Sequence, residues 1–334
     1  MNNFNKSPSF QTTDWETEEK EPVLSKKELM EKIQSFDIKH LTHEDIGFMN
    51  RTIRSYFCDN FPVDDELMNQ LEKRITILNA DDYERTFGEL CKDAEENFSD
   101  VLGFYSQVHG KIFINAPAHE NTEQLFATMF HESLHLASIE TGGGFAGDWL
   151  CLLPTEDEEA KDLMMTLIDT GRNTLIEGTT QLIVLASVVG DMGFDRTAVA
   201  SDYISECAIM NAVWLPFSRE EMMQAYFKMS IEDLRIQIEK TFTSKEERDK
   251  IDEEKGNGLF TKYLYSLGLA TENMNEALWN PEDDGGVEDI LREVRNLVAA
   301  YIMQDCENNG IALTAENRKE LRNYIDPYEE DDYV

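Results

Sequence analysis

The sequence predicts an α+β protein that is mostly helical, with one small sheet beside a helix that carries the motif HESLH at 131–135. Apolar residues recur at helical spacing through most of residues 24–325. One stretch, FYSQVHGKIFIN at 104–115, instead alternates β-branched and aromatic residues, as a pair of strands does. The segment around the motif is apolar on nearly all sides, which is typical of a buried helix.

The first hundred residues are expected to form a disordered segment, 1–23, followed by a helical subdomain, 24–100. Ser25 and Glu28 form a capping box at the start of the first helix. Helical patterns then cover 43–60, 65–78 and 82–97.

A central unit that holds the motif is expected to span residues 101–240. After the strand pair, which turns near Gly110, Asn121 caps a helix that continues to about Ser138 and ends before three glycines at 142–144. Thr155 begins the next helix, and Gly171 is expected to interrupt it. Further helices are expected at 173–189, at 197–213 and from Ser218 onward. A C-terminal helical subdomain at 241–325 and an acidic tail at 326–334 follow.

The composition sets limits on partners. The chain has 334 residues, 41% of them apolar, which is enough for one sizeable domain or two modest ones. Its formal net charge of −37 is repelled by nucleic-acid phosphates and by anionic membrane surfaces. We therefore expect no nucleic acid and no membrane insertion. The sequence does not indicate an oligomeric state.

The cysteines indicate a reducing compartment. They are odd in number and show no CxxC spacing, which fits free thiols better than a disulfide framework. The first twenty residues are polar and resemble no signal peptide. A cytoplasmic location is therefore expected, and leaderless secretion as a bacterial effector or toxin stays open.

The motif HESLH has the spacing of a zinc site. In a helix, His131 and His135 lie on one face about one turn apart. Two neutral imidazoles and a carboxylate hold Zn²⁺ tetrahedrally and leave the fourth position open. Glu132 lies beside them as a candidate general base. The alternative is a pair of histidines on a solvated helix face, but two buried histidines require polar partners.

A third protein ligand must come from elsewhere. No histidine follows His135, and Ser138 and Thr141 occupy positions where metzincins need glycine and histidine, so a carboxylate is required. Glu177 lies inside the apolar stretch LIEGTTQLI, where an unpaired charge is costly. We predict Glu177 as the third ligand. The alternative is a buried ion pair with Arg172 or another cation.

FHESLH followed further along the chain by IEGTTQ resembles gluzincin-type zinc metallopeptidases, particularly small bacterial enzymes with HExxH and EGxT motifs. The likeness covers about residues 100–240. It includes three further segments: GKIFIN at 110–115, Ser201-Asp202-Tyr203, and QAYF at 224–227. It implies a zincin-like catalytic core with Zn²⁺ bound by His131, His135 and Glu177, and with Glu132 as the catalytic base.

Around the predicted ligands, the sequence departs from the pattern of thermolysin-like enzymes. In place of the NExxxD pattern of thermolysin-like enzymes, Gln181 stands four residues after the glutamate, where it is expected to accept a hydrogen bond from a ligand histidine. The histidine that stabilises the oxyanion in those enzymes is absent, so Tyr203 is the first candidate for that role and Tyr226 the second. Both tyrosines also suit a core position. Lys111–Asn115 is expected to be an edge strand that pairs with extended substrate.

The sequence therefore predicts a zinc-dependent endopeptidase that acts on a protein or peptide substrate. The alternative is a regulatory or interaction protein of zincin fold that binds zinc without broad proteolytic activity. A third hypothesis is an acidic helical binding protein in which the motif is accidental.

Overall fold

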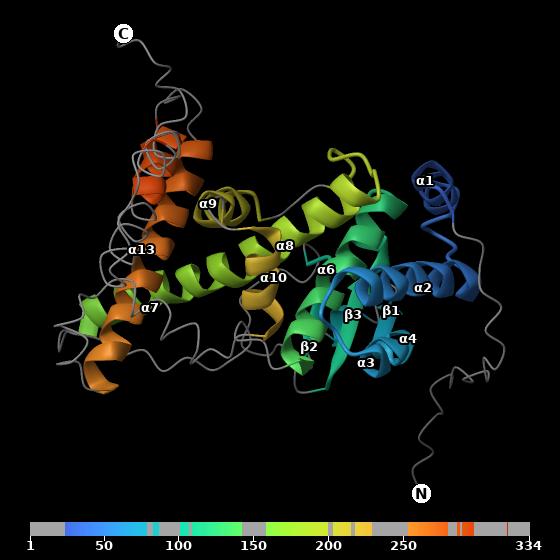
Figure 1. Ribbon diagram of the computed structural model, residues 1–334, viewed down its shortest axis with the longest axis horizontal. Coiled ribbons are helices and arrows are strands. Elements are labelled where there is room, and N and C mark those ends of the chain that lie inside the picture. Colours follow the sequence, from blue (N-terminus) through green and yellow to red (C-terminus); the bar gives the residue numbers. More distant parts are fainter. Residues whose placement is uncertain are drawn as a thin grey trace, which may run out of the picture.

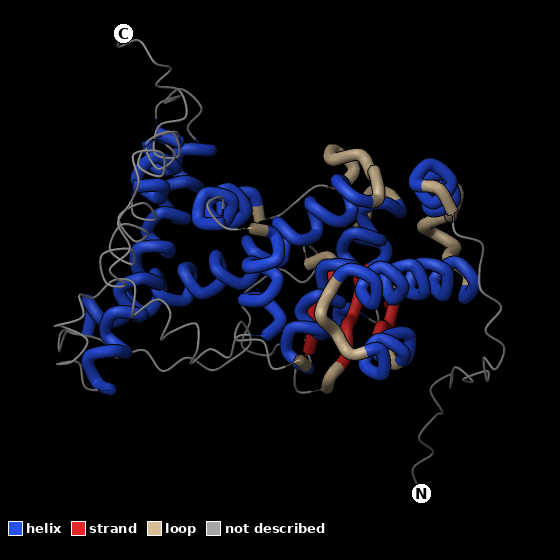
Figure 2. Tube along the Cα trace, viewed as in Figure 1, coloured by secondary structure: helices blue, strands red, loops and turns tan. Residues whose placement is uncertain are grey.

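The computed structural model describes residues 24–78, 83–86, 101–106, 109–141, 158–199, 203–214, 218–228, 253–279, 286–287, 289–296 and 319. Over these residues the chain is mostly helical with one three-stranded sheet, which confirms the predicted α+β class (Figure 1). The strands gather at one end of the molecule and are surrounded by helices (Figure 2). The expected disordered segment and acidic tail lie outside the described residues, as does most of the expected C-terminal subdomain beyond 296.

Side-chain caps begin the N-terminal helices. In α1 (Lys26–Gln34) the predicted capping box is confirmed, since Ser25 N–H donates to the Glu28 carboxylate at 2.8 Å. Thr42 and Asp45 make the same box at α2 (His43–Asn60), whose bounds match the predicted helix. Each such cap is worth about 1 kcal/mol. The short helices α3 (Asp65–Asn69) and α4 (Leu71–Arg74) follow.

The sheet consists of β1 (Ile75–Leu78), β2 (Gly103–Ser106) and β3 (Lys111–Asn115) in the order β1-β3-β2. β3 is parallel to β1 and antiparallel to β2, and Gly110 turns the hairpin with a φ of 57°. The prediction of one helix over 65–78 is wrong, because its last four residues form β1. The prediction that Lys111–Asn115 is an edge strand is also wrong. β3 is central, and β2 lies at the edge.

The motif lies on α6 (Thr122–Glu140), which the short helix η1 (Ala116–Ala118) precedes. Asn121 caps α6 as predicted, by accepting the Gln124 N–H at 2.8 Å. The helix packs against α1, both strands of the hairpin, α8 and α10. Most of its side chains from Leu125 to Ala137 are therefore buried. The histidine pair does not lie on a solvated helix face.

One continuous helix crosses the molecule and links the sheet end to the far end (Figure 1). It consists of α7 (Glu158–Asn173), the π-helical turns η3 (Thr174–Gly178), α8 (Thr179–Val184) and the π-helical turns η4 (Leu185–Asp191). The backbone torsions at the three junctions are helical. The predicted interruption at Gly171 is wrong, since this residue lies within α7. Thr155, the predicted cap, lies outside the described residues.

Gly171 does not interrupt its helix but allows a second helix to cross it closely. A Cβ at Gly171 would lie 1.8 Å from the Leu264 carbonyl oxygen of α13 (Glu253–Trp279), and one at Gly268 would lie 1.8 Å from the Leu167 oxygen. We expect Gly171→Ala to lower the free energy of unfolding by roughly 1–3 kcal/mol or more, because the two backbones must separate. Urea denaturation measures this effect.

Gly190→Ala is the matched control. Apart from the adjoining backbone of its own helix, the nearest atom to a Cβ at Gly190 is the Leu185 oxygen at 3.8 Å, an ordinary contact. Alanine should be neutral there, or stabilise the helix by about 0.5–1 kcal/mol. Equal destabilisation by both substitutions would show that Gly171 is not needed for the crossing.

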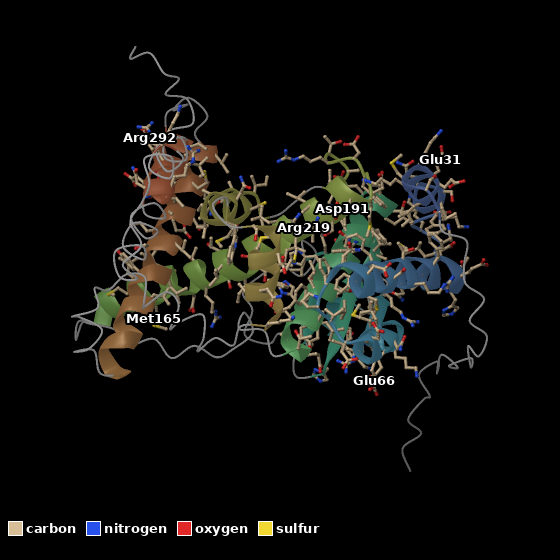
Figure 3. All side chains as sticks on the ribbon, in the orientation of Figure 1. Glu31, Glu66, Met165, Asp191, Arg219 and Arg292 are labelled. Carbon is tan, nitrogen blue, oxygen red and sulfur yellow. The ribbon has the colours of Figure 1, made fainter. Side chains whose placement is uncertain are left out.

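Two further helices, α9 (Ile204–Trp214) and α10 (Arg219–Lys228), complete the described core. α9 begins several residues later than the predicted start at 197. Arg219 of α10 forms an ion pair with Asp191 at 2.8 Å (Figure 3). The Tyr56 hydroxyl donates to the same carboxylate. These bonds join α10, η4 and α2. Residues 83–86 and 289–296 are also largely helical, and no helix within the described ranges is long and apolar enough to span a membrane.

Candidate metal centre

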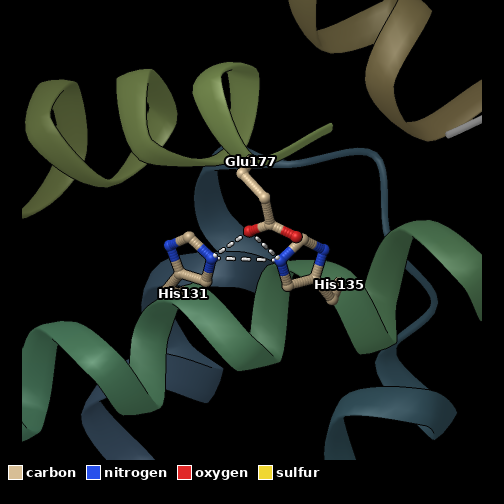
Figure 4. A group of neighbouring side chains, drawn as sticks. All are labelled: His131, His135 and Glu177. Atoms are coloured by element: carbon tan, nitrogen blue, oxygen red, sulfur yellow. Dashed lines mark hydrogen bonds and ion pairs between the residues drawn. The ribbon is translucent and has the colours of Figure 1, made fainter. Parts of the chain in front are cut away.

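Two helices bring three ligand-type side chains together (Figure 4). His131 and His135 come from α6, one turn apart, and Glu177 comes from η3 of the crossing helix. His131 Nε2 lies 3.0 Å from His135 Nε2 and 3.0 Å from Glu177 Oε2. The third side of the triangle, from His135 Nε2 to Glu177 Oε2, is 3.1 Å. The structure thus brings together the three residues that were predicted from the sequence as metal ligands.

The geometry of these donor atoms fits zinc. In a tetrahedral site with bonds of about 2.0–2.1 Å, neighbouring donor atoms lie about 3.3 Å apart. The three separations here are close to that value, and the donors are two imidazole nitrogens and one carboxylate oxygen. A triangle of protein ligands leaves one tetrahedral position open, as catalytic zinc sites require.

Glu177 is held as a charged group. Burial raises its pKa, but the charges of His135 and His131 and their hydrogen bonds outweigh that effect and keep the pKa well below its usual range. Its side chain is 22% exposed, against 8% for His131 and 14% for His135. The alternative partner, Arg172, pairs with Asp169 at 3.9 Å instead. The nearest ion-pair partners of Glu177 are therefore the two histidines.

Gln181 orients His131. Its Oε1 lies 3.1 Å from His131 Nδ1, as expected from the sequence. Since a carboxamide oxygen accepts, His131 carries a proton on Nδ1, which leaves Nε2 as the atom that would bind a metal ion. This is the usual arrangement for a histidine that binds metal. Gln181 is 5% exposed, so water does not replace this bond readily.

At a zinc site formed by these three donors, Gln181→Leu should weaken zinc binding by about 10–100-fold, the usual effect of removing such a partner. Without the acceptor, His131 is free to adopt the tautomer that is protonated on Nε2. Competition against a chromophoric chelator measures the affinity. Gln181→Glu keeps an acceptor at the same position and serves as the control, with affinity equal to wild type or higher. Equal affinities for wild type and Gln181→Leu would remove Gln181 from the site.

Glu132 is buried beside the three donors, with 8% of its surface exposed. Burial raises its pKa to about 7, with the charge of His131 opposing and that of Glu177 adding to the rise. The backbone N–H of Tyr105 in β2 donates to its carboxylate. No side-chain pattern encodes a backbone donor, so this contact could not be predicted from the sequence. A carboxylate with these neighbours is suited to accept and return a proton near neutral pH.

The two candidate tyrosines differ in position. The Tyr203 ring stacks on His131, with centroids 5.6 Å apart and an angle of 15° between the planes. Tyr226 is fully buried, and its hydroxyl lies 2.8 Å from Thr180 Oγ1. Burial raises the pKa of Tyr226 well above its ordinary value, and the nearby charges of Glu177 and Glu132 add to this. Tyr203 therefore contacts a predicted metal ligand directly, whereas Tyr226 is buried and its hydroxyl contacts Thr180.

Other histidines have structural contacts. His119 is buried, and its two ring nitrogens contact the Asn115 carbonyl oxygen at 2.8 Å and Thr128 Oγ1 at 3.0 Å. Burial lowers its pKa. His40 lies on the surface, 2.9 Å from Asp37. Neither has a place in the metal centre.

No family model, curated protein or solved structure gives a significant match to this chain. The function is therefore inferred from the residues of the metal centre and their geometry.

Proposed function

We propose that the protein is a zinc-dependent endopeptidase of gluzincin type with a zincin-like catalytic core. The observation that carries the proposal is the triangle of His131 Nε2, His135 Nε2 and Glu177 Oε2, with sides of 3.0, 3.0 and 3.1 Å, next to the buried carboxylate of Glu132. Zinc held there would supply a Lewis acid for the scissile carbonyl and a coordinated water with a pKa of about 7.

Glu132 performs the proton transfers in this proposal. Its carboxylate takes a proton from the attacking water and delivers it to the leaving amine. The Tyr105 N–H holds one side of the carboxylate, which fixes its direction relative to the histidines. The low exposure of Glu132 keeps bulk water from competing for the proton.

β2 is the strand along which a substrate would bind. Asn115 N–H donates to Leu102 O at 2.8 Å, so the alternating pattern of an antiparallel pair directs the backbone groups of Gly103 and Tyr105 away from β3. The backbone N–H of Tyr105 donates to the Glu132 carboxylate. An extended peptide added at this edge would run beside the catalytic carboxylate.

Tyr203 is the proposed oxyanion partner. Its ring lies against His131 at the start of α9, on the border of the metal centre. A phenol hydroxyl there would donate to the oxyanion that develops on the substrate carbonyl.

The proposal is tested with a proteome-derived peptide library. Protein reconstituted with zinc should cut a subset of peptides, detected as new termini by mass spectrometry. Cleavage should stop when the zinc is removed with 1,10-phenanthroline and return when zinc is added back. Zinc-loaded protein that binds one metal ion but cuts nothing would contradict the proposal and favour a zinc-binding regulatory protein.

A further inference from the structure

Tyr226 lies between the two helices that carry the proposed zinc ligands. Its backbone oxygen accepts a hydrogen bond from Ser138 Oγ at 2.7 Å. Thr141 Oγ1 also lies 2.9 Å from the carbonyl oxygen of the next residue, Phe227, although its single proton is shared with the Ala137 and Ser138 oxygens of α6. Ser138 follows His135 by one turn of α6. The backbone of α10 is therefore fixed to the helix of the two histidines.

The side chain of Tyr226 reaches the other helix. Its hydroxyl lies 2.8 Å from Thr180 Oγ1, and Thr180 Oγ1 donates to the Ile176 carbonyl oxygen at 2.8 Å. Because Thr180 has a single hydroxyl proton and uses it on Ile176, the Tyr226 hydroxyl is the donor in the first bond. Ile176 directly precedes Glu177 in the π-helical turns η3. The hydrogen bonds that start at the Tyr226 hydroxyl therefore end on the peptide group between Ile176 and Glu177, the proposed third ligand.

We infer that Tyr226 is a positioning residue, which fixes the Glu177 turn at the right distance from the two histidines by bonding α6 through its backbone and η3 through Thr180. This inference rests on the proposed zinc site. η3 needs such support because its hydrogen-bond register is the wider π-helical one, found mostly as short, isolated turns. Tyr226 is fully buried and its hydroxyl contacts Thr180, so its proposed effect on the site is exerted through the peptide group that precedes Glu177.

Tyr226→Phe tests the inference, since it removes the hydroxyl and keeps the ring. Zinc affinity, measured by chelator competition, should fall by about 10–100-fold, as for other residues that orient ligands. The visible absorption spectrum of the cobalt-substituted protein should change, because the Glu177 oxygen shifts relative to the imidazoles. Thr180→Val should reproduce both effects, and Thr180→Ser, which keeps the hydroxyl, should restore them.

Tyr56→Phe is the matched control. It too removes a hydrogen-bonded phenol hydroxyl, but this one is partly buried and donates to Asp191 of η4, which does not belong to the metal centre. It should leave zinc affinity and the cobalt spectrum as in wild type. If Tyr56→Phe weakens zinc as much as Tyr226→Phe does, the effect is general destabilisation and the inference fails.

Two further results separate the failure of this inference from that of the proposed function. Wild type that binds zinc, together with a Tyr226→Phe variant of equal affinity and unchanged cobalt spectrum, overturns the positioning role alone. A lower kcat without either change would assign Tyr226 to substrate contact. Wild type that binds neither zinc nor cobalt overturns both the site and the role of Tyr226.

Discussion

Glu132→Gln is expected to lower kcat/KM for peptide cleavage by roughly 10²–10⁴-fold while zinc stays bound. A carboxamide has nearly the shape of the carboxylate and can still meet the Tyr105 N–H through its oxygen, but it cannot accept the proton of the attacking water. The proposed ligands His131, His135 and Glu177 are untouched. Cleavage of the best library peptide and zinc content are measured on the same preparation.

Glu123→Gln is the control for this substitution. Glu123 is another buried glutamate of α6, 7% exposed, in the first turn of the helix and away from the three donors. Its replacement should leave both cleavage and zinc content near wild type. If Glu132→Gln loses zinc together with activity, Glu132 supports the metal and is not simply a base. If it keeps full activity, the proposed mechanism is wrong.

The second large effect is expected from Glu177→Ala, which should weaken zinc binding by more than about 10²-fold. Groups that only orient a ligand already contribute 10–100-fold, and a ligand should contribute more. The substitution also leaves two imidazole nitrogens 3.0 Å apart without the carboxylate that both now contact. Chelator competition and the melting temperature with and without zinc give the two readouts.

Glu206→Ala serves as the comparison for Glu177→Ala. Glu206 lies on α9, and burial, followed by the charge of Glu177, raises its pKa, so it is a nearby carboxylate outside the donor triangle. Its removal should change zinc affinity by no more than a few-fold. Equal zinc binding by wild type and Glu177→Ala would reject Glu177 as a ligand.

Local sequence signals predicted the parts of the fold that depend on neighbouring residues. The capping box at Ser25, the cap at Asn121 and the full extent of α2 follow from contacts within one helical turn. The errors come from distant contacts. β1 is only four residues long and exists because it pairs with β3. The interruption predicted at Gly171 is wrong because this glycine allows α7 to cross α13, and its crossing partner, Gly268, lies far along the chain.

The same distinction applies to the metal centre. The spacing of His131 and His135 and the isolated charge of Glu177 in an apolar stretch were visible in the sequence, and the structure brings these side chains together. The contact of Gln181 could be predicted because this residue follows Glu177 by about one helical turn. The Tyr105 backbone donor was not, because it depends on how β2 meets α6. The direction of the Tyr226 hydroxyl likewise depends on the packing of α10.

The most direct measurement is zinc K-edge X-ray absorption on the purified protein, combined with its metal content. The proposed centre predicts one zinc ion per chain, with nitrogen and oxygen ligands at about 2.0–2.1 Å and the outer-shell scattering of two imidazoles. Substoichiometric zinc, sulfur ligands at about 2.3 Å, or scattering from a single imidazole would contradict zinc binding by His131, His135 and Glu177.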